Sequence, residues 1–263
     1  MTWMLADAHV HLFATAELPA VAAAARRHFR AQAARGQLAG RLNFCLFLVE
    51  MAGQDCFTRL RELALAGEDL CGLALRTGAE AHTLCLGAEE APLFLFAGRQ
   101  IVSAEGLEIL ALGLTEQYPE RQPAETVLAE LLQQPVVVVL PWGVGKWLGR
   151  RGRLLGTLVA RFGSQGLFLG DNGNRPCCWP LPGLFAALGQ ARNLPGTDPL
   201  ALPGQTERVG SFGFQAQAEL DAHRPFQSFR EQVLGGSLLP MPYGRPQRIL
   251  PFFQSQLALR RKG

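Results

Sequence analysis

Two histidines near the amino terminus, His9 and His11, are the residues of this sequence best suited to metal chemistry. They lie in the segment Asp7-Ala8-His9-Val10-His11, at the end of an apolar run that predicts a β-strand. Side chains two residues apart in a strand point to the same face. Both imidazoles could therefore reach a single metal ion. The alternative interpretation is a pair of core histidines hydrogen-bonded to each other.

Five further residues at or near the ends of predicted strands could line a substrate pocket: Arg99, Trp142, Lys146, Asp171 and Arg175. Lys146 lies in a glycine-rich segment just before a predicted helix, and cations near a helix N-terminus favour an anion. Trp142 could stack on a planar group or exclude water. The alternatives remain open, since the basic stretch also fits a solvated helix and Asp171 also fits a turn.

The elements that must position these residues alternate between short apolar segments and helical segments, which predicts a parallel sheet. The predicted strands are 3–11, 42–49, 135–140, 166–170 and 192–196, and the predicted helices are 19–35, 54–66, 123–134, 149–162 and 184–188. The stretch 72–114 holds four short strand-like runs joined by turn residues, which predicts a meander or hairpins. The candidate residues follow the carboxyl ends of strands, where α/β folds build their sites.

No linker divides the chain, so we expect one domain over 1–263, with a core at about 3–200. The remainder, about 201–263, is rich in proline, glycine and glutamine and predicts a wrap-around tail with one helix, at 216–221 or 226–234.

Composition excludes several classes of protein. The chain has 263 residues, of which 48% are hydrophobic and 18% are charged, which excludes a disordered chain or a coiled coil. A net charge of +3 is too small to argue for nucleic acid as a partner. No apolar run approaches the roughly 20 residues of a membrane span. Six cysteines without CxxC spacing and the lack of a secretory signal favour a reduced, cytoplasmic protein.

The segment Leu5–Leu12 (LADAHVHL) resembles the opening motif of the metal-dependent hydrolase superfamily, which contains the amidohydrolases and the PHP (polymerase and histidinol phosphatase) domains. The segment Ser103–Gly113 is similar to the PHP strand in which a glutamate bridges metals, with Glu108 at the matching position. Asp198 is similar to the last-strand aspartate, a metal ligand that can activate the bound water. The resemblance implies a (β/α) barrel.

We therefore expect an α/β fold, a distorted TIM-like (β/α) barrel of seven or eight strands, with a hairpin-rich insertion near 72–114 and an irregular C-terminal tail. The chain holds only five histidines, so it cannot supply the fuller ligand cage of the PHP group. One zinc, manganese or iron ion held by His9, His11 and a carboxylate, Asp198 or Glu108, matches the open geometry of a catalytic site.

The expected function is a metal-dependent hydrolase that acts on a small anionic substrate, for example a phosphoester, through a metal-activated water. Asp198 would accept the proton, and Lys146 would act beside it with Arg175, Arg99, Asp171 and Trp142 at the substrate. The alternative is a degenerate barrel without a metal ion, which binds an anionic ligand or a partner protein without turnover.

Overall fold

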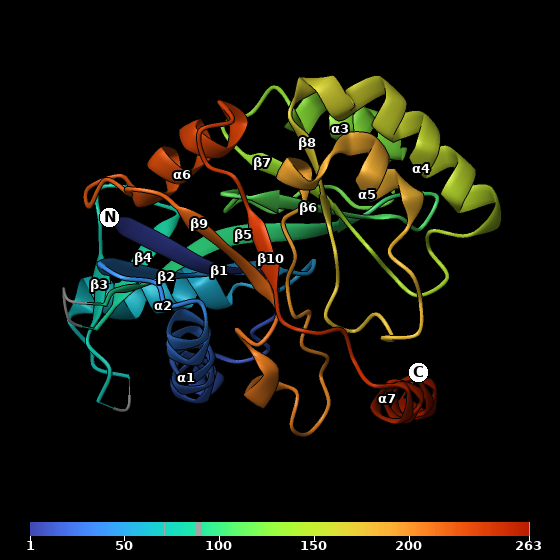
Figure 1. Ribbon diagram of the computed structural model, residues 1–263. Coiled ribbons are helices and arrows are strands. Elements are labelled where there is room, and N and C mark those ends of the chain that lie inside the picture. The colour runs from blue at the N-terminus through green and yellow to red at the C-terminus, as the bar shows by residue number, and fades with distance from the viewer. Residues whose placement is uncertain (71, 88–90, 263) are drawn as a thin grey trace.

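The computed structural model describes residues 1–70, 72–87 and 91–262, and its centre is a curved, mixed β-sheet (Figure 1). The strands follow the order β10-β9-β1-β2-β5-β6-β7-β8, with β3 and β4 joined to the side of β5. Their bounds are β1 Thr2–Val10, β2 Arg41–Glu50, β3 Leu75–Thr77, β4 Thr83–Leu86, β5 Leu93–Val102, β6 Glu108–Leu112, β7 Val137–Pro141, β8 Leu167–Gly170, β9 Gly213–Gln217 and β10 Met241–Tyr243.

Helices cover the two halves of the sheet separately. Their bounds are α1 Leu18–Arg35, α2 Cys56–Ala66, α3 Ala124–Leu131, α4 Gly149–Phe162, α5 Gly183–Leu188, α6 Pro225–Leu234 and α7 Ile249–Lys262. In Figure 1, α1 and α2 lie below one half of the sheet, and α3, α4 and α5 lie above the other half. Two separate outer cores result, one between α1, α2 and the β1–β2–β5 region and one between α3, α4 and the β6–β7–β8 region.

A third core fills the concave inner face of the sheet. Side chains of β2 alternate between the two faces, so that Phe44 packs in the outer core and Phe47 in the inner one. Phe226 and Phe229 of α6 fill this inner space, and the Phe229 ring centroid lies 5.0 Å from that of Phe47. The unbroken apolar runs of the sequence reflect this burial on both faces.

The expected (β/α) barrel is wrong: the fold is a half-barrel built on a mixed sheet, with no complete ring of helices around the described strands. Strands β1, β2 and β5 are parallel, as are β7 and β8, but β6 runs antiparallel to both of its neighbours. The reason is the short connection from β5 to β6, a tight turn in which Ser103 donates its N–H to the Leu107 carbonyl at 2.9 Å. Parallel pairing would need a much longer crossover.

Two further parts of that fold prediction need correction. The hairpins expected near 72–114 form, apart from 88–90, which lie outside the described residues, but β5 and β6 are central strands and not an insertion. The region after 201 is not an irregular tail, because β9 pairs antiparallel with β1 and β10 pairs with β9. No helix in the described ranges is long and apolar enough to cross a membrane.

Candidate metal centre

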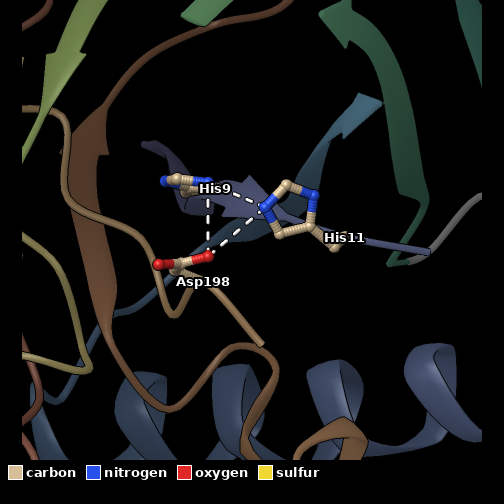
Figure 2. A group of neighbouring side chains, drawn as sticks. All are labelled: His9, His11 and Asp198. Atoms are coloured by element: carbon tan, nitrogen blue, oxygen red, sulfur yellow. Dashed lines mark hydrogen bonds and ion pairs between the residues drawn. The ribbon is translucent and has the colours of Figure 1, made fainter. Parts of the chain in front are cut away.

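His9 and His11 lie at the carboxyl end of β1, where the pairing with β2 shifts register between Asp7 and Val10. Both side chains are buried and turn to the same place, as Figure 2 shows. Their Nε2 atoms lie 3.1 Å apart, and the ring centroids are 4.9 Å apart at an interplanar angle of 69°. The prediction that both imidazoles reach one point is thus met by the geometry.

Asp198 comes from the segment 193–198, which lies between β8 and the carboxyl end of β1. Leu194 donates its N–H to the β8 carbonyl of Leu169 at 2.8 Å, and Asp198 donates to the His9 carbonyl at 2.8 Å. The approach requires glycine at position 196, because a Cβ atom there would lie 2.3 Å from the His9 nitrogen. The segment 192–196 was predicted as a strand, but it forms only isolated bridges.

Buried Asp7 anchors this segment to β1. Its carboxyl accepts hydrogen bonds from the Thr197 N–H at 2.9 Å, from the Thr197 hydroxyl at 2.5 Å and from the Gly210 N–H at 2.9 Å. Burial raises the pKa of Asp7 to about 6, although these hydrogen bonds oppose the shift. Asp7 therefore holds the backbone beside Asp198, whose own φ of 48° lies in the left-handed region.

The three side chains fit a metal ion. Asp198 Oδ1 lies 3.4 Å from His9 Nε2 and 3.3 Å from His11 Nε2. In a tetrahedral zinc site with bonds of about 2.0–2.1 Å, neighbouring ligand atoms are separated by roughly 3.3–3.4 Å. Among the described residues, His9, His11 and Asp198 form the group of histidine, cysteine or acidic side chains whose ligand atoms all lie within 4.8 Å of one another.

Hydrogen bonding alone does not account for the contacts at His9 Nε2. This nitrogen lies near His11 Nε2, near Gln100 Oε1 at 3.0 Å and near Asp198 Oδ1, yet it carries at most one proton. Burial lowers the pKa of His9, which favours the neutral imidazole. Burial alone would raise the pKa of Asp198, but His9, His11 and the Asn172 amide outweigh it and hold that pKa below its usual value. Neutral imidazole and carboxylate are the forms that bind metals.

Asn172 fixes the orientation of the Asp198 carboxylate. Its Nδ2 donates to Asp198 Oδ2 at 2.6 Å and to the Trp142 carbonyl at 3.1 Å. The side chain of Asn172 thus ties the ligand to the β7 and β8 ends of the sheet. Partners of this kind orient metal ligands and strengthen binding.

Glu108 and Lys146 lie beside the three ligands but outside them. The Lys146 ammonium forms an ion pair with the Glu108 carboxylate at the start of β6, and both side chains are partly exposed. The Glu108 charge is near enough to favour the charged form of His9. The structure therefore places Glu108 next to the expected metal position, while Asp198 supplies the carboxylate of the triad.

Two predicted substrate-binding arginines are held by partners within the protein. Arg99 is buried and pairs with Glu50 at 3.2 Å, and it also donates to the Thr115 carbonyl at 2.6 Å. Arg175 is buried against Asp171, with Nε to Oδ1 at 2.7 Å and Nη2 to Oδ2 at 2.9 Å. The structure thus gives both arginines and Asp171 structural contacts, and Trp142 is buried in the same loop as Lys146, between β7 and α4.

Sequence reasoning missed Gln100 and Arg208. Gln100 reaches His9 because it lies in β5 on the inner face of the curved sheet, a position that no local pattern identifies. Arg208 donates to the Gly173 carbonyl at 2.8 Å and belongs to a turn that packs against the loop after β8. Gly210 was a sequence signal for a turn beside Arg208. Glycine also marks exposed turns, so the sequence did not predict that Val209 and Gly210 are buried.

No protein-family model matches this chain, and no curated protein matches it. Among solved structures, the crystal structure of PsfC from Pseudomonas syringae PB-5123 is similar, with a TM-score of 0.58 over 98% of this chain and 100% of the PsfC chain. The two sequences are 15% identical, so the likeness concerns the fold alone. The chain is thus similar in fold to PsfC along nearly its whole length, while its relation to the metal-dependent hydrolases stays an interpretation of its sequence motifs.

Proposed function

We propose that this protein is a metal-dependent hydrolase of a small anionic substrate, with one divalent ion held by His9, His11 and Asp198. The convergence of their three ligand atoms at 3.1–3.4 Å carries the proposal. Three protein ligands leave one coordination position for water, as in catalytic zinc sites. When bound, such an ion lowers the pKa of its water towards neutrality and polarises the substrate.

The surrounding residues divide the remaining tasks. Asp198 has one oxygen in the triad and the other on Asn172, which leaves it fixed as a ligand. Glu108 is the better proton acceptor, because it lies beside the triad and, among the described residues, its carboxylate is engaged by Lys146 alone. This differs from the roles expected from the sequence, in which Asp198 accepted the proton and either Asp198 or Glu108 ligated the metal.

Lys146 supplies the positive charge for the anionic part of the substrate. Its ammonium is paired with Glu108. A phosphate or carboxylate group of the substrate would compete for the ammonium, and Glu108 would then become free to take a proton from water. Because exchange of one partially exposed ion pair for another costs little, substrate binding can drive it.

The experiment is a metal analysis joined to an activity screen. Protein purified without chelator or histidine tag is analysed for zinc, manganese and iron, and then assayed on phosphoesters and carboxylic esters. We expect one ion per chain and hydrolysis, both lost in the His9→Ala/His11→Ala variant. The matched control is His28→Ala. His28 lies on α1, outside the triad, and its Nδ1 is hydrogen-bonded to the Val209 carbonyl at 2.9 Å.

Metal binding without turnover on any ester would contradict the hydrolase proposal and favour the ligand-binding alternative. Equal metal content in the parent and the double variant would contradict the site itself.

A reduced compartment such as the cytoplasm agrees with the free cysteines of the described residues.

A further inference from the structure

A cavity lined by tryptophans lies beside the candidate metal centre. Its volume is about 280 Å³, and its walls include Trp142, Trp147, Trp179, Leu148, Leu181 and Gly183. These residues come from the loop between β7 and α4, from the loop before α5 and from the first position of α5. The chain has four tryptophans in all, so three of them gather here.

The aromatic side chains are held in place by contacts within the protein. Trp142 and Trp179 meet edge to face with centroids 6.3 Å apart, and Trp147 stacks on Phe185 at 5.4 Å. The Trp147 Nε1 donates to the Pro141 carbonyl at 3.0 Å. These contacts fix the walls of the cavity, although Trp179 and Leu181 remain 37% and 45% exposed. Walls made mainly of aromatic and apolar side chains are typical of a ligand-binding pocket.

Two sets of contacts link the walls of the cavity to residues of the metal centre and its surroundings. The Trp142 carbonyl accepts from Asn172, whose same nitrogen donates to Asp198 Oδ2. The stem of Lys146 also packs on Gly143, which lines the cavity, since a Cβ atom at Gly143 would lie 2.8 Å from Lys146 Cδ. The stem of Lys146 therefore borders the cavity wall, while its ammonium is engaged by Glu108.

We infer that this cavity binds a flat aromatic ring that carries an anionic group, such as an aryl phosphate or aryl carboxylate. The ring would lie among the tryptophans and the anion would reach Lys146. The inference deepens the proposed function and rests on it only for the reaction at the anionic group. The volume is below the range of drug-sized pockets, roughly 300–1,000 Å³, and so suits one small ring system.

The test measures tryptophan fluorescence in chelator-treated protein during titration with phenylphosphonate or methylphosphonate. The two probes carry the same anionic group, and only the first has a ring. We expect saturable quenching by phenylphosphonate, with a Kd about ten- to a hundredfold lower than for methylphosphonate, because burial of one aromatic ring has that effect. Toluene should bind more weakly than phenylphosphonate in the parent, and Lys146→Met should remove that difference.

A pair of glycine variants provides the control. Leucine at Gly183 would enter the cavity, and the Cβ position there meets no atom within 4 Å. Gly156 of α4 also has open space at its Cβ position but does not line the cavity. We expect Gly183→Leu to weaken phenylphosphonate binding at least tenfold and Gly156→Leu to leave it unchanged. Trp179→Ala, which removes a partly exposed wall, should weaken it as well.

Equal affinities for the two phosphonates in the parent would overturn the inference. So would binding to phosphatidylcholine vesicles that depends on Trp179 without any binding of phenylphosphonate, because the exposed patch would then be a lipid contact. Since the titration uses metal-free protein, failure of the metal analysis leaves a positive ring-binding result intact, and the two proposals can fail separately.

Discussion

Replacement of Asp198 by asparagine should abolish tight metal binding while preserving the shape of the site. The Asp198 carboxylate uses Oδ1 for the triad and Oδ2 to accept from the Asn172 amide at 2.6 Å. An asparagine has one oxygen and one NH₂ group. If its oxygen faces the histidines, its NH₂ meets the NH₂ of Asn172, and if it turns round, it presents hydrogens to the metal.

The expected magnitude follows from the number of ligands. Structural zinc sites with four ligands bind with about 10–16 kcal/mol, or roughly 2.5–4 kcal/mol per ligand, which corresponds to about a 60- to 1,000-fold increase in Kd when one ligand is lost. At a free metal concentration about 100 times the Kd, binding stabilises the parent by about 2.7 kcal/mol. A 100-fold weaker variant would gain about 0.4 kcal/mol under the same conditions.

The assay is thermal unfolding with zinc and with chelator, followed by circular dichroism. At about 2–4 °C per kcal/mol, the zinc-dependent shift in Tm should be about 5–10 °C for the parent and below about 2 °C for Asp198→Asn. Glu125→Gln is the control, because Glu125 forms an exposed ion pair with Arg161 far from the triad in sequence. A zinc-dependent shift in Asp198→Asn as large as in the parent would refute the reasoning.

Three other predictions concern stability. Arg99→Met should lower the free energy of unfolding by about 3–5 kcal/mol in urea titrations, because it leaves the Glu50 carboxylate buried without its ion-pair partner. An unchanged urea midpoint would mean that Arg99 is not needed for this ion pair and is available to bind a ligand. Phe229→Ala should cost about 3–5 kcal/mol by the same measurement, since this fully buried ring fills the inner face of the half-barrel, and a loss below about 1 kcal/mol would contradict that packing. Glu80→Gln should destabilise the protein, because the Glu80 carboxylate accepts from the N–H groups of Phe226 at 3.0 Å and Gln227 at 2.8 Å at the start of α6. Burial alone would raise the pKa of Glu80, but these and other hydrogen bonds outweigh it and lower that pKa, so the contribution is present at neutral pH and is lost as the pH falls through the folded-state value. The difference between parent and Glu80→Gln should therefore shrink as the pH falls below the ordinary glutamate pKa of 4.5, and a difference that grows on acidification would show the sign to be wrong.

Much of the secondary structure could be predicted from local sequence alone. The helix α4 lies at Gly149–Phe162 as expected, and β5 lies at Leu93–Val102. The pairing of His9 with His11 was also predictable, because the two-residue period of a strand depends only on the backbone. Glu108 was placed near the site by its motif, but its ion pair with Lys146 was not foreseen.

The direction of the strands and the completion of the site were decided by tertiary structure. An apolar run such as Val136–Leu140 reports that both faces are buried, and it is the same for a parallel and an antiparallel neighbour. Asp198 reaches the histidines because Gly196 lets its segment approach β1, and Gln100 arrives from a strand 91 residues away from His9 in the chain. Such contacts depend on the curvature of the sheet and on which strand ends share an edge. Local periodicity determines where an element begins and which side of it is apolar, whereas the packing of distant elements determines which polar groups meet.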